Sequence, residues 1–515
     1  MQRPSTILEL LAIGASDAIA ISAPGAAPLT YEQLRLASTQ TEHSLRQVGI
    51  GAQDRVALVL PNGPEMAVAF VCIAAHAAAA PLNPAYRADE FEFYLSDLNA
   101  KAILVEYGSQ SPAIAIAKKL NIQILELHLS GNGAGSFTIT SQQPASNEAG
   151  TGTPGPDHIA LILHTSGTTS RPKIVPLTQA NVCASACNVR DTVRLTASDC
   201  GLAIMPLFHI HGLIAGLLAP LAAGGQIFCT PGFNALRFFN WMNEAKPSWY
   251  TAVPTMHQII VARAESNREI IQANPLRFIR SSSSSMPPQV IRALEETFNT
   301  PLIESYGMTE AAHQMASNPL PPAKRIPGSV GIAAGPDIAI MDIEGNLLPN
   351  GATGEIVIRG VNVTSGYENN PKANAEAYTN GWFRTGDQGV LDQDNYLSIT
   401  GRLKEIISRG GEKISPREVD EIIMDHPAVA QVVTFGMPHE KLGEEVAAAV
   451  VLREGQHVSE KELREFIAIR LADSASTLGQ AENTCSAVGL RNLFCVQIKS
   501  ARFTKTPAWC LIRNF

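Results

Sequence analysis

One loop of small, hydroxylated residues has the composition of a phosphate-binding site. It follows a run with buried-strand character, Ile159 to Leu163, and reads His164-Thr165-Ser166-Gly167-Thr168-Thr169-Ser170-Arg171-Pro172-Lys173. Backbone N–H groups and hydroxyls in such a loop can donate hydrogen bonds to a polyphosphate, and Lys173 adds a mobile positive charge. The chain contains no G-x-x-x-x-G-K-S/T sequence, which disfavours a Walker-type nucleoside triphosphatase.

Five further motifs follow this loop along the chain. They are Pro206-Leu-Phe-His209-Ile-His-Gly212, Ser305-Tyr306-Gly307-Met308-Thr309-Glu310, Trp382-Phe-Arg-Thr385-Gly386-Asp387, Gly401-Arg402-Leu403-Lys404-Glu405 and Gly410-Gly411-Glu412-Lys413-Ile414-Ser415-Pro416. Together with the loop, and in this order, they resemble the motifs of the ANL superfamily, which comprises acyl-CoA synthetases, nonribosomal-peptide adenylation domains and luciferases. The resemblance covers residues 1 to about 471.

The resemblance implies an ATP-dependent, AMP-forming acid–thiol ligase that works in two steps. A carboxylate attacks the α-phosphate of ATP to give an acyl-adenylate and pyrophosphate, and the thiol of coenzyme A then displaces AMP. Because the first step joins two anions, it needs cations and Mg²⁺ around the α-phosphate. The implied partners are therefore a small carboxylic acid, ATP, Mg²⁺ and coenzyme A.

The same resemblance assigns roles to individual residues. The ATP and AMP contacts fall on Thr165, Ser166, Gly167, Thr168, Thr169, Lys173, Ser305, Tyr306, Gly307, Thr309, Asp387 and Arg402. Tyr306 would lie against adenine, and the carboxylate of Asp387 can accept two hydrogen bonds from the ribose diol. Glu310 is the implied ligand of Mg²⁺, a hard cation that prefers oxygen.

Further assignments concern the transfer step. Lys404 matches the position about which the small domain of this family swings, and Gly410 and Gly411 match the segment that approaches the thiol of coenzyme A. His209 and Lys404 are the expected catalytic residues.

Two stretches that line the acyl pocket in this family indicate a short, polar acid. Arg280 is followed by five serines, Ser281 to Ser285, where ligases of coumarate or fatty acids usually carry glycine and alanine. Glu310 is followed by Ala311-Ala312-His313, and an imidazole with a pKa near neutrality can form a charge-assisted bond to a second carboxylate. In the alternative interpretation, His313 is a structural hydrogen-bonding residue and the serines are part of a loop.

Other strings resemble the oxalate–CoA ligase branch of plants and fungi. They are Asn83-Pro-Ala-Tyr86, Glu90-Phe-Glu-Phe-Tyr-Leu-Ser96, Trp249-Tyr-Thr-Ala-Val-Pro-Thr255 and Ser317-Asn-Pro-Leu320. We therefore expect oxalate as the acid, with His209, Ser283 and His313 as its contacts and His211 as the rival to His209. The alternatives are a ligase for another acid, aromatic and 4-coumarate-like or medium-chain, and a nucleotide-binding pseudoenzyme.

Strand and helix patterns alternate around these motifs and predict an α/β fold. Thr30 and Gln33 form a capping box that opens a helix, and the apolar run from Arg55 to Leu60 predicts a buried strand. A helix is expected to run through Ala80, and residues 131–156 are expected to form a surface linker. The rhythm implies mostly parallel sheets covered by helices.

Together with the resemblance, these patterns predict the domain organisation. We expect a large N-terminal domain of stacked α/β subdomains over residues 1–400 and a hinge at 401–404. A small, mobile α+β domain is expected over residues 405–515.

The chain departs from the family pattern after about residue 471. The family continues to a Leu-Pro-Lys-Thr-x-x-Gly-Lys string whose final lysine approaches the reacting carboxylate and the α-phosphate, whereas here Lys505-Thr506-Pro507 precedes Ala508-Trp509-Cys510. We interpret this tail as an altered reading frame, a retained intron, a splice variant or a divergent end. Loss of that cation predicts ATP binding with adenylation slowed about 10²–10³-fold or more. The small domain is also expected to lack its last strand and helix.

Composition narrows the remaining classes of protein. Hydrophobic residues are 45% of the chain, which is enough for a large core, and the net charge of −8 disfavours a nucleic-acid binder. The eight cysteines form no disulfide or zinc framework, so reduced thiols are expected. The N-terminus does not match a signal peptide, no apolar run predicts a membrane span, and Arg-Asn-Phe at the end differs from a peroxisomal signal. A cytoplasmic location is expected over a peroxisomal one; the oligomeric state stays open.

Overall fold

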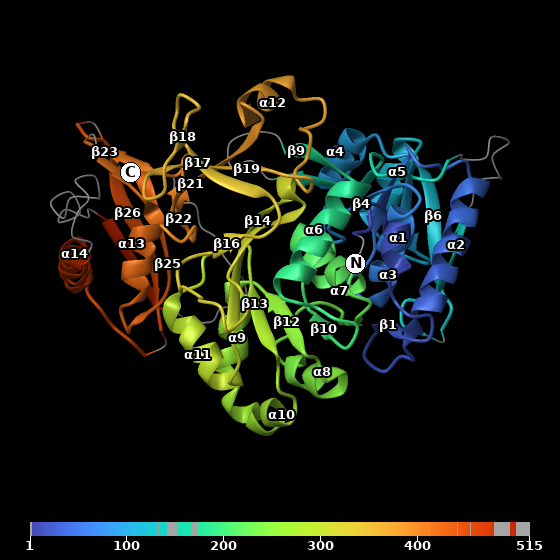
Figure 1. Cartoon of the computed structure of the whole chain (residues 1–515), viewed down its shortest axis with the longest axis horizontal. Coiled ribbons are helices and arrows are strands. Elements are labelled where there is room, and N and C mark those ends of the chain that lie inside the picture. Colours follow the sequence, from blue (N-terminus) through green and yellow to red (C-terminus); the bar gives the residue numbers. More distant parts are fainter. Residues whose placement is uncertain are drawn as a thin grey trace. The chain divides into compact units, whose positions relative to one another are not determined.

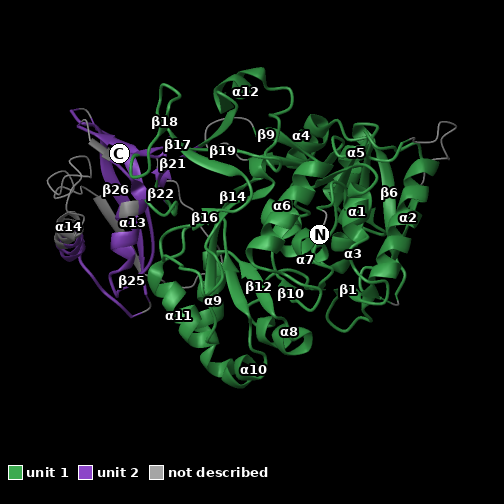
Figure 2. Ribbon diagram, in the orientation of Figure 1, with its two compact units in different colours: residues 1–352, 356–385, 391–398 green, residues 353–355, 386–390, 399–515 purple. Residues whose placement is uncertain are grey.

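The computed structural model describes residues 3–131, 133–141, 152–165, 172–410, 412–439, 441–453, 455–477 and 495–500 (Figure 1). The chain divides into two compact units, coloured separately in Figure 2. Unit 1 comprises Met1–Ala352, Ile356–Thr385 and Leu391–Ser398, and unit 2 comprises Thr353–Glu355, Gly386–Val390 and Ile399–Phe515. The α/β fold class predicted from the sequence is confirmed.

A seven-stranded sheet of unit 1 has the order β7-β6-β5-β3-β4-β8-β9, parallel in its middle and antiparallel at both edges. Its strands are β3 (Arg55–Val59), β4 (Ala78–Pro81), β5 (Ala102–Glu106), β6 (Gln123–Leu129), β7 (Phe137–Ser141), β8 (Ile159–Thr165) and β9 (Lys173–Thr178). The helices from this part of the chain are α1 (Ile7–Leu11), α2 (Tyr31–Gln47), α3 (Pro64–Ala74), α4 (Ala88–Leu98) and α5 (Pro112–Lys119). The central strands are buried and almost wholly apolar, as a covered parallel sheet requires.

In this region, the predicted capping box and strand are confirmed, and the predicted end of the next helix is wrong. The capping box of Thr30 and Gln33 is present at the start of α2, and the predicted strand is β3. The predicted helix does not reach Ala80, because α3 ends at Ala74 and the following alanines enter strand β4. Pairing with β3 in the buried sheet overrides the helix propensity of alanine there.

The expected linker is also partly wrong. Strand β7 lies within the segment expected to be a surface linker and pairs antiparallel with β6. Residues 142–151 of that segment lie outside the described residues.

A nine-stranded sheet of unit 1 has the order β16-β15-β14-β13-β12-β10-β11-β1-β2, and the strands from β14 to β1 in this order run parallel. Its strands are β1 (Ile19–Ser22), β2 (Leu29–Thr30), β10 (Cys200–Ala203), β11 (Gln226–Cys229), β12 (Trp249–Ala252), β13 (Phe278–Ser281), β14 (Leu302–Met308), β15 (His313–Ser317) and β16 (Ile332–Ala333). The helices are α6 (Gln179–Thr192), the π-helix η1 (His211–Leu218), α7 (Ala219–Leu221), α8 (Phe238–Ala245), α9 (Pro254–Ala262), η2 (Glu265–Asn267), α10 (Arg268–Ala273), α11 (Pro288–Phe298) and η3 (Thr309–Ala311).

One apolar core fixes this sheet against its helices. Trp241 of α8, Ile260 of α9 and Leu294 of α11 pack with Tyr250 of β12 and Ile279 of β13. These helices lie beside β12 and β13 in the lower part of Figure 1. The serine run begins at the last residue of β13, and the Tyr306 motif begins in the carboxyl half of β14.

A third sheet has the order β18-β17-β19-β21-β20, with β22 paired to β21. Its elements are β17 (Asp337–Met341), β18 (Leu347–Leu348), β19 (Thr353–Arg359), α12 (Pro371–Ala377), β20 (Tyr378–Thr379), β21 (Trp382–Leu391) and β22 (Leu397–Arg402).

Unit 2 contains a sheet of order β24-β23-β26-β25, in which β27 also pairs with β26. Its elements are β23 (Ile407–Arg409), β24 (Glu412–Ile414), α13 (Pro416–Met424), β25 (Val429–His439), β26 (Gly443–Leu452), α14 (Glu460–Thr477) and β27 (Cys495–Ser500). The expectation that the small domain lacks its last strand is wrong, because β27 pairs in parallel with β26. Residues 478–494 and 501–515, with the atypical Lys505-Thr506-Pro507 string, lie outside the described residues.

Two expectations from composition can be compared with the described part of the chain. Cys72, Cys183, Cys187, Cys200 and Cys229 are free thiols there, as predicted. Within that part, no helix combines the length and apolarity that a membrane crossing requires.

Candidate active site

The hairpin of β8 and β9 carries the two ends of the predicted phosphate loop. Thr165 is the last residue of β8, Lys173 is the first of β9, and the two form a register pair. The strands therefore hold the loop closed at its base. Ser166, Gly167, Thr168 and Thr169 lie outside the described residues.

Lys173 and Glu310 are joined by a tyrosine that the sequence reasoning did not select. The Nζ of Lys173 lies 4.2 Å from the centroid of the Tyr367 ring, and the Tyr367 hydroxyl donates to Oε1 of Glu310 at 2.9 Å. Burial and the adjacent Glu310 carboxylate raise the pKa of Tyr367 far above its usual value, so this hydroxyl stays a donor. The geometry thus connects the phosphate loop to the buried carboxylate of the Tyr306 motif.

The Tyr306 motif depends on a close approach of two strands. Ser305 and Tyr306 are buried on β14, and the Ser305 hydroxyl lies 3.0 Å from that of Ser317 on β15. A Cβ at Gly307 would lie 1.7 Å from the carbonyl oxygen of His313, so only glycine lets β15 pass this close. Thr309 then opens the short helix η3, which also contains Glu310.

Three polar side chains from separate elements meet at the carboxyl end of β13. Nδ1 of His211 lies 3.0 Å from the Ser283 hydroxyl, and the His211 ring stacks on that of His313 with centroids 4.9 Å apart. His211 begins the π-helix η1, Ser283 follows β13, and His313 begins β15. π-Helical turns frequently occur at functional sites. We call His211, Ser283 and His313 the imidazole cluster.

Two members of the imidazole cluster have unusual backbone conformations. Ser283 has φ of +76° and His313 has φ of +93°. Residues with side chains rarely adopt positive φ, and each such case costs about 1–3 kcal/mol and recurs at active sites. The surrounding fold therefore holds both side chains in place at an energetic cost.

The histidine preferred from the sequence lies outside the cluster. His209 is exposed, and its ring packs against that of Phe208 at a centroid distance of 4.6 Å. The rival residue, His211, is the one that contacts Ser283. A catalytic or substrate role for His209 stays a prediction.

The expected charge on His313 is wrong. Burial, and then the Arg280 guanidinium beside it, hold the pKa of His313 well below its usual value, so the imidazole is neutral near pH 7. Burial and Arg280 lower the pKa of His211 in the same way. The positive charge at this end of the sheet belongs to Arg280, whose Nη2 lies 3.0 Å from Nε2 of His313.

The remaining described site residues belong to unit 2. Asp387 is buried and accepts a hydrogen bond from Nε of the exposed Arg402 at 3.1 Å. Lys404 lies exposed in the turn after β22. Gly410 has φ of +58° in the turn between β23 and β24, and Gly411 lies outside the described residues.

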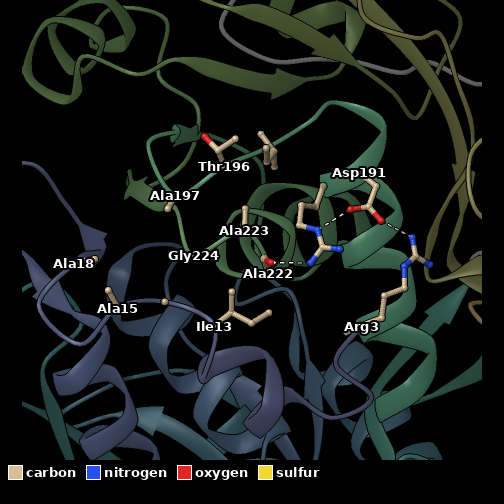
Figure 3. Close-up of a pocket in the computed structure, with 13 residues that line it drawn as sticks. Arg3, Ile13, Ala15, Ala18, Asp191, Thr196, Ala197, Ala222, Ala223 and Gly224 are labelled. Carbon is tan, nitrogen blue, oxygen red and sulfur yellow. Dashed lines mark hydrogen bonds and ion pairs between the residues drawn. The ribbon is translucent and has the colours of Figure 1, made fainter. Parts of the chain in front are cut away.

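A separate pocket of about 620 Å³ contains none of the predicted site residues (Figure 3). Its lining includes Arg3 and Arg190, which both pair with Asp191, at 2.6 and 2.7 Å. We therefore place the candidate site at the hairpin of β8 and β9, which we call the phosphate hairpin, and at the imidazole cluster rather than at this pocket.

Family models and curated relatives match most of the chain. The family model described as "AMP-binding enzyme" matches residues 12–368, and the model described as "AMP-binding enzyme C-terminal domain" matches residues 418–481. A relative from Arabidopsis thaliana, "Oxalate--CoA ligase", is 45% identical over 91% of this chain and 92% of its own. A relative of the same name from Saccharomyces cerevisiae is 41% identical over 82% of this chain and 81% of its own.

A solved structure has the same fold. ATP-bound MatB from Rhodopseudomonas palustris covers 93% of both chains with a TM-score of 0.80 and 27% identity. The first family model alone spans more than half of the chain, and both curated relatives exceed 40% identity. The chain therefore belongs to the AMP-binding enzyme family, the ANL superfamily that its motifs resemble.

Proposed function

We propose that this protein is an ATP-dependent, AMP-forming acid–CoA ligase whose preferred acid is oxalate. The observation that carries the choice of acid is the imidazole cluster, which puts a serine hydroxyl and two neutral imidazoles beside a buried guanidinium. Such a surface suits a short acid with polar atoms at both ends and is poorly suited to an alkyl or aromatic tail. The names of the two curated relatives support the same acid.

The proposed first step joins the acid to ATP. A carboxylate oxygen attacks the α-phosphorus, the bond to the β-phosphate oxygen breaks, and pyrophosphate leaves an acyl-adenylate behind. Lys173 is proposed to bring positive charge to the phosphates, together with the loop residues Thr165 to Thr169. The Tyr367 hydroxyl holds one oxygen of Glu310 and so orients this buried carboxylate.

Mg²⁺ fits the chemistry of this carboxylate. Glu310 presents a hard oxygen ligand, and Mg²⁺ in phosphate sites commonly takes one or two carboxylates together with phosphate oxygens and water. When bound, Mg²⁺ would reduce the repulsion between the two anions. Thr309, Ser305 and Gly307 are proposed as neighbouring ATP contacts, with Tyr306 against adenine.

The proposed second step transfers the acyl group. The sulfur of coenzyme A attacks the acyl carbon, the bond to AMP breaks, and the thiol proton is released. Gly410 and Gly411 are proposed to lie beside the thiol, and Asp387 and Arg402 to hold the ribose of AMP. We further propose a large adenylating domain over residues 1–400, a hinge at 401–404 and a mobile small domain over 405–515.

The test is the release of AMP by the full chain with ATP, coenzyme A and one acid at a time. We expect the highest kcat/KM with oxalate and lower values with malonate, acetate and 4-coumarate. Turnover of 4-coumarate equal to or above that of oxalate would reject oxalate as the acid.

One observation favours a second function. The sequence carries Lys505-Thr506-Pro507 without a following Gly-Lys, so the lysine that the family places beside the α-phosphate has no counterpart in this string. A nucleotide-binding pseudoenzyme would bind ATP yet release no AMP with any acid. The ligase proposal instead expects slow but measurable pyrophosphate release that depends on the acid.

We also propose a cytoplasmic location for the protein. The described cysteines are free thiols, which suits a reducing compartment. Localisation of the tagged full-length chain to a peroxisome or another organelle would reject this assignment.

A further inference from the structure

Arg280 is a buried guanidinium whose hydrogen-bonded partners in the described part of the chain include no carboxylate. Its side chain is fully buried, and its contacts are His211, Thr251, His313 and Gln314. Burial lowers its pKa to about 9, which still leaves it charged at neutral pH. A buried charge without a counter-charge is unfavourable, so the fold retains Arg280 against a cost.

The acidic residue of the neighbouring strand β14, Glu304, lies on the other face of the sheet. Arg280 pairs with Ile303 of β14, and Glu304 pairs with Ser281. Side chains alternate between the two faces of a sheet, so Glu304 shares the face of Ser281 rather than that of Arg280. The four side chains that bond to Arg280 are uncharged or cationic, so none of them neutralises the guanidinium.

The hydrogen bonds of Arg280 set the proton positions of both imidazoles. A guanidinium only donates, so Nε2 of His313 accepts from Nη2 at 3.0 Å. Nη1 lies 3.4 Å from both Nε2 of His211 and the Thr251 hydroxyl, and that hydroxyl lies 2.6 Å from the same Nε2. Nε2 is therefore the acceptor in both rings, and each neutral imidazole carries its proton on Nδ1.

The proton position of His211 also determines how Ser283 is hydrogen-bonded. With its proton on Nδ1, His211 donates to the Ser283 hydroxyl oxygen at 3.0 Å. The hydroxyl hydrogen of Ser283 is then directed at a different acceptor. A chain of donors thus runs from the charge of Arg280 through the imidazole to the serine.

We propose that Arg280 is the positioning residue that selects a dicarboxylic acid: it fixes both imidazoles as Nδ1–H donors and provides the positive charge for the second carboxylate. This rests on the proposed ligase function, because the carboxylate that is held is the one that does not react with ATP. Arg280 acts through His211 and His313, since it is itself buried away from the acid. The other titratable groups around His211 are His209 and His257, and neither supplies a negative charge.

The role predicts a difference between acids. The positive charge of Arg280 strengthens the binding of the second carboxylate of a dicarboxylate. A monocarboxylate has no second carboxylate and gains no binding energy from this charge. Loss of the charge therefore raises KM for oxalate and leaves KM for acetate nearly unchanged. Because Arg280 does not face the reacting carboxylate, kcat changes less than KM.

Two pairs of variants separate charge from structure. Arg280→Met removes the guanidinium, and Arg280→Lys keeps the charge with a different donor geometry. Gln314→Glu places a carboxylate where the amide oxygen now lies 3.0 Å from Nη2, which neutralises the charge in place. Gln314→Leu is the matched control, since it removes the same hydrogen bond without adding a charge.

The first readout is the tautomer of each imidazole, measured by ¹⁵N NMR on the full chain labelled at histidine. His211→Asn and His313→Asn variants assign the two signals. We expect Nδ1–H in both rings of the unmodified chain and a shift toward Nε2–H in Arg280→Met. Nε2–H rings in the unmodified chain would overturn the proposal, whatever acid the enzyme uses.

The second readout is the KM for oxalate and for acetate. We expect Arg280→Met and Gln314→Glu to raise the oxalate KM about 10-fold or more, as for a lost charged contact, and to change the acetate KM less than about 2-fold. Equal rises for both acids would overturn the proposal. If Arg280→Met does not fold, Gln314→Glu against Gln314→Leu gives the same comparison. An unmodified chain with Nδ1–H rings but no turnover of oxalate would reject the acid and leave the tautomer assignment standing.

Discussion

At the scale of single residues, a charged guanidinium lies in contact with two neutral imidazoles. Arg280 carries the charge, and the two imidazoles beside it stay neutral because burial and that charge depress their pKa values. An acid held by an imidazolium would bind more tightly as the pH falls through about 6.5. An acid held by neutral N–H donors backed by a guanidinium would not.

We therefore predict that the KM for oxalate is flat between about pH 6 and 8. His211 and His313 have pKa values well below the usual 6.5, so both stay neutral in this window, and Arg280, with a pKa of about 9, stays mostly charged. The check is the KM measured at half-unit steps of pH with ATP and coenzyme A saturating. A KM that falls several-fold from pH 8 to 6 would show a protonating histidine in the acid site.

A second prediction concerns Tyr367. The substitution Tyr367→Phe keeps the ring beside Lys173 and deletes the hydroxyl that donates to Glu310. A hydrogen bond to a charged group contributes about 1.5–3 kcal/mol, so we expect half-saturation by Mg²⁺ to need on the order of 10- to 100-fold more metal.

Tyr378→Phe is the matched control for this prediction. The hydroxyl of Tyr378 donates to the carbonyl of Thr364 and makes no hydrogen bond to Glu310 among the described contacts. If the two variants need the same Mg²⁺ concentration for half-saturation, the Tyr367 hydroxyl does not contribute to Mg²⁺ binding.

Sequence reasoning reached only part of the site at this scale. Ser283 and His313 were selected because they align with a family pocket, and in the structure both contact His211. Arg280 and Tyr367 were not selected as site residues, because a role that consists of orienting a neighbour depends on which atoms face each other. The choice between His209 and His211 depends on the same kind of information, since the two residues of one motif have different surroundings.

At the scale of elements, the approach of β15 to β14 positions both the Tyr306 motif and His313. Gly307 faces the backbone of His313 across this antiparallel pair. A side chain there has no room, because the nearest atom is a backbone oxygen that cannot turn away. The strand pair thus depends on one residue that lacks a side chain.

We predict that Gly307→Ala lowers the free energy of unfolding by about 1–3 kcal/mol and moves His313 out of the cluster. The check is chemical denaturation together with the KM for oxalate. Gly216→Ala is the control, because the nearest atom to its Cβ would lie at an ordinary contact distance of 3.9 Å. A Gly307→Ala protein with unchanged stability and KM would contradict the packing described for β14 and β15.

Elements were predicted well where the signal is local. The capping box of α2 and the apolar run of β3 were identified because their patterns are complete within a few residues. The alanine run after α3 and the polar strand β7 were misassigned, since partners far along the chain decide those segments. Strand β27 was not expected because the chain departs from the family pattern after about residue 471, yet Cys495–Ser500 pairs with β26.

At the scale of the whole molecule, the two units each carry part of the proposed machinery. Unit 1 holds the phosphate hairpin and the imidazole cluster, and unit 2 holds Asp387, Arg402, Lys404 and Gly410. A two-step reaction that uses both sets of residues is expected to need motion at the proposed hinge. The fold class could be predicted from the family resemblance, because six motifs in the order of the family indicate the family's fold.

We predict that Lys404→Pro slows thioester formation at least about 10-fold while leaving pyrophosphate release within about 3-fold. Proline fixes its own φ and restricts the residue before it, so it stiffens the turn after β22. The two half-reactions are measured separately, by pyrophosphate release and by transfer from a preformed acyl-adenylate. Lys404→Ala is the control, and equal effects of the two variants would assign the change to the lost side chain rather than to the hinge.

The central claim is that this chain forms an acyl-CoA from oxalate through an adenylate. The most direct measurement is a competition in which the full chain receives ATP, Mg²⁺, coenzyme A and equal concentrations of oxalate, malonate, acetate and 4-coumarate. Mass spectrometry then identifies the products. The account predicts oxalyl-CoA as the most abundant thioester, with AMP formed in equal amount. A product dominated by 4-coumaroyl-CoA, or ATP binding without any AMP, would contradict it.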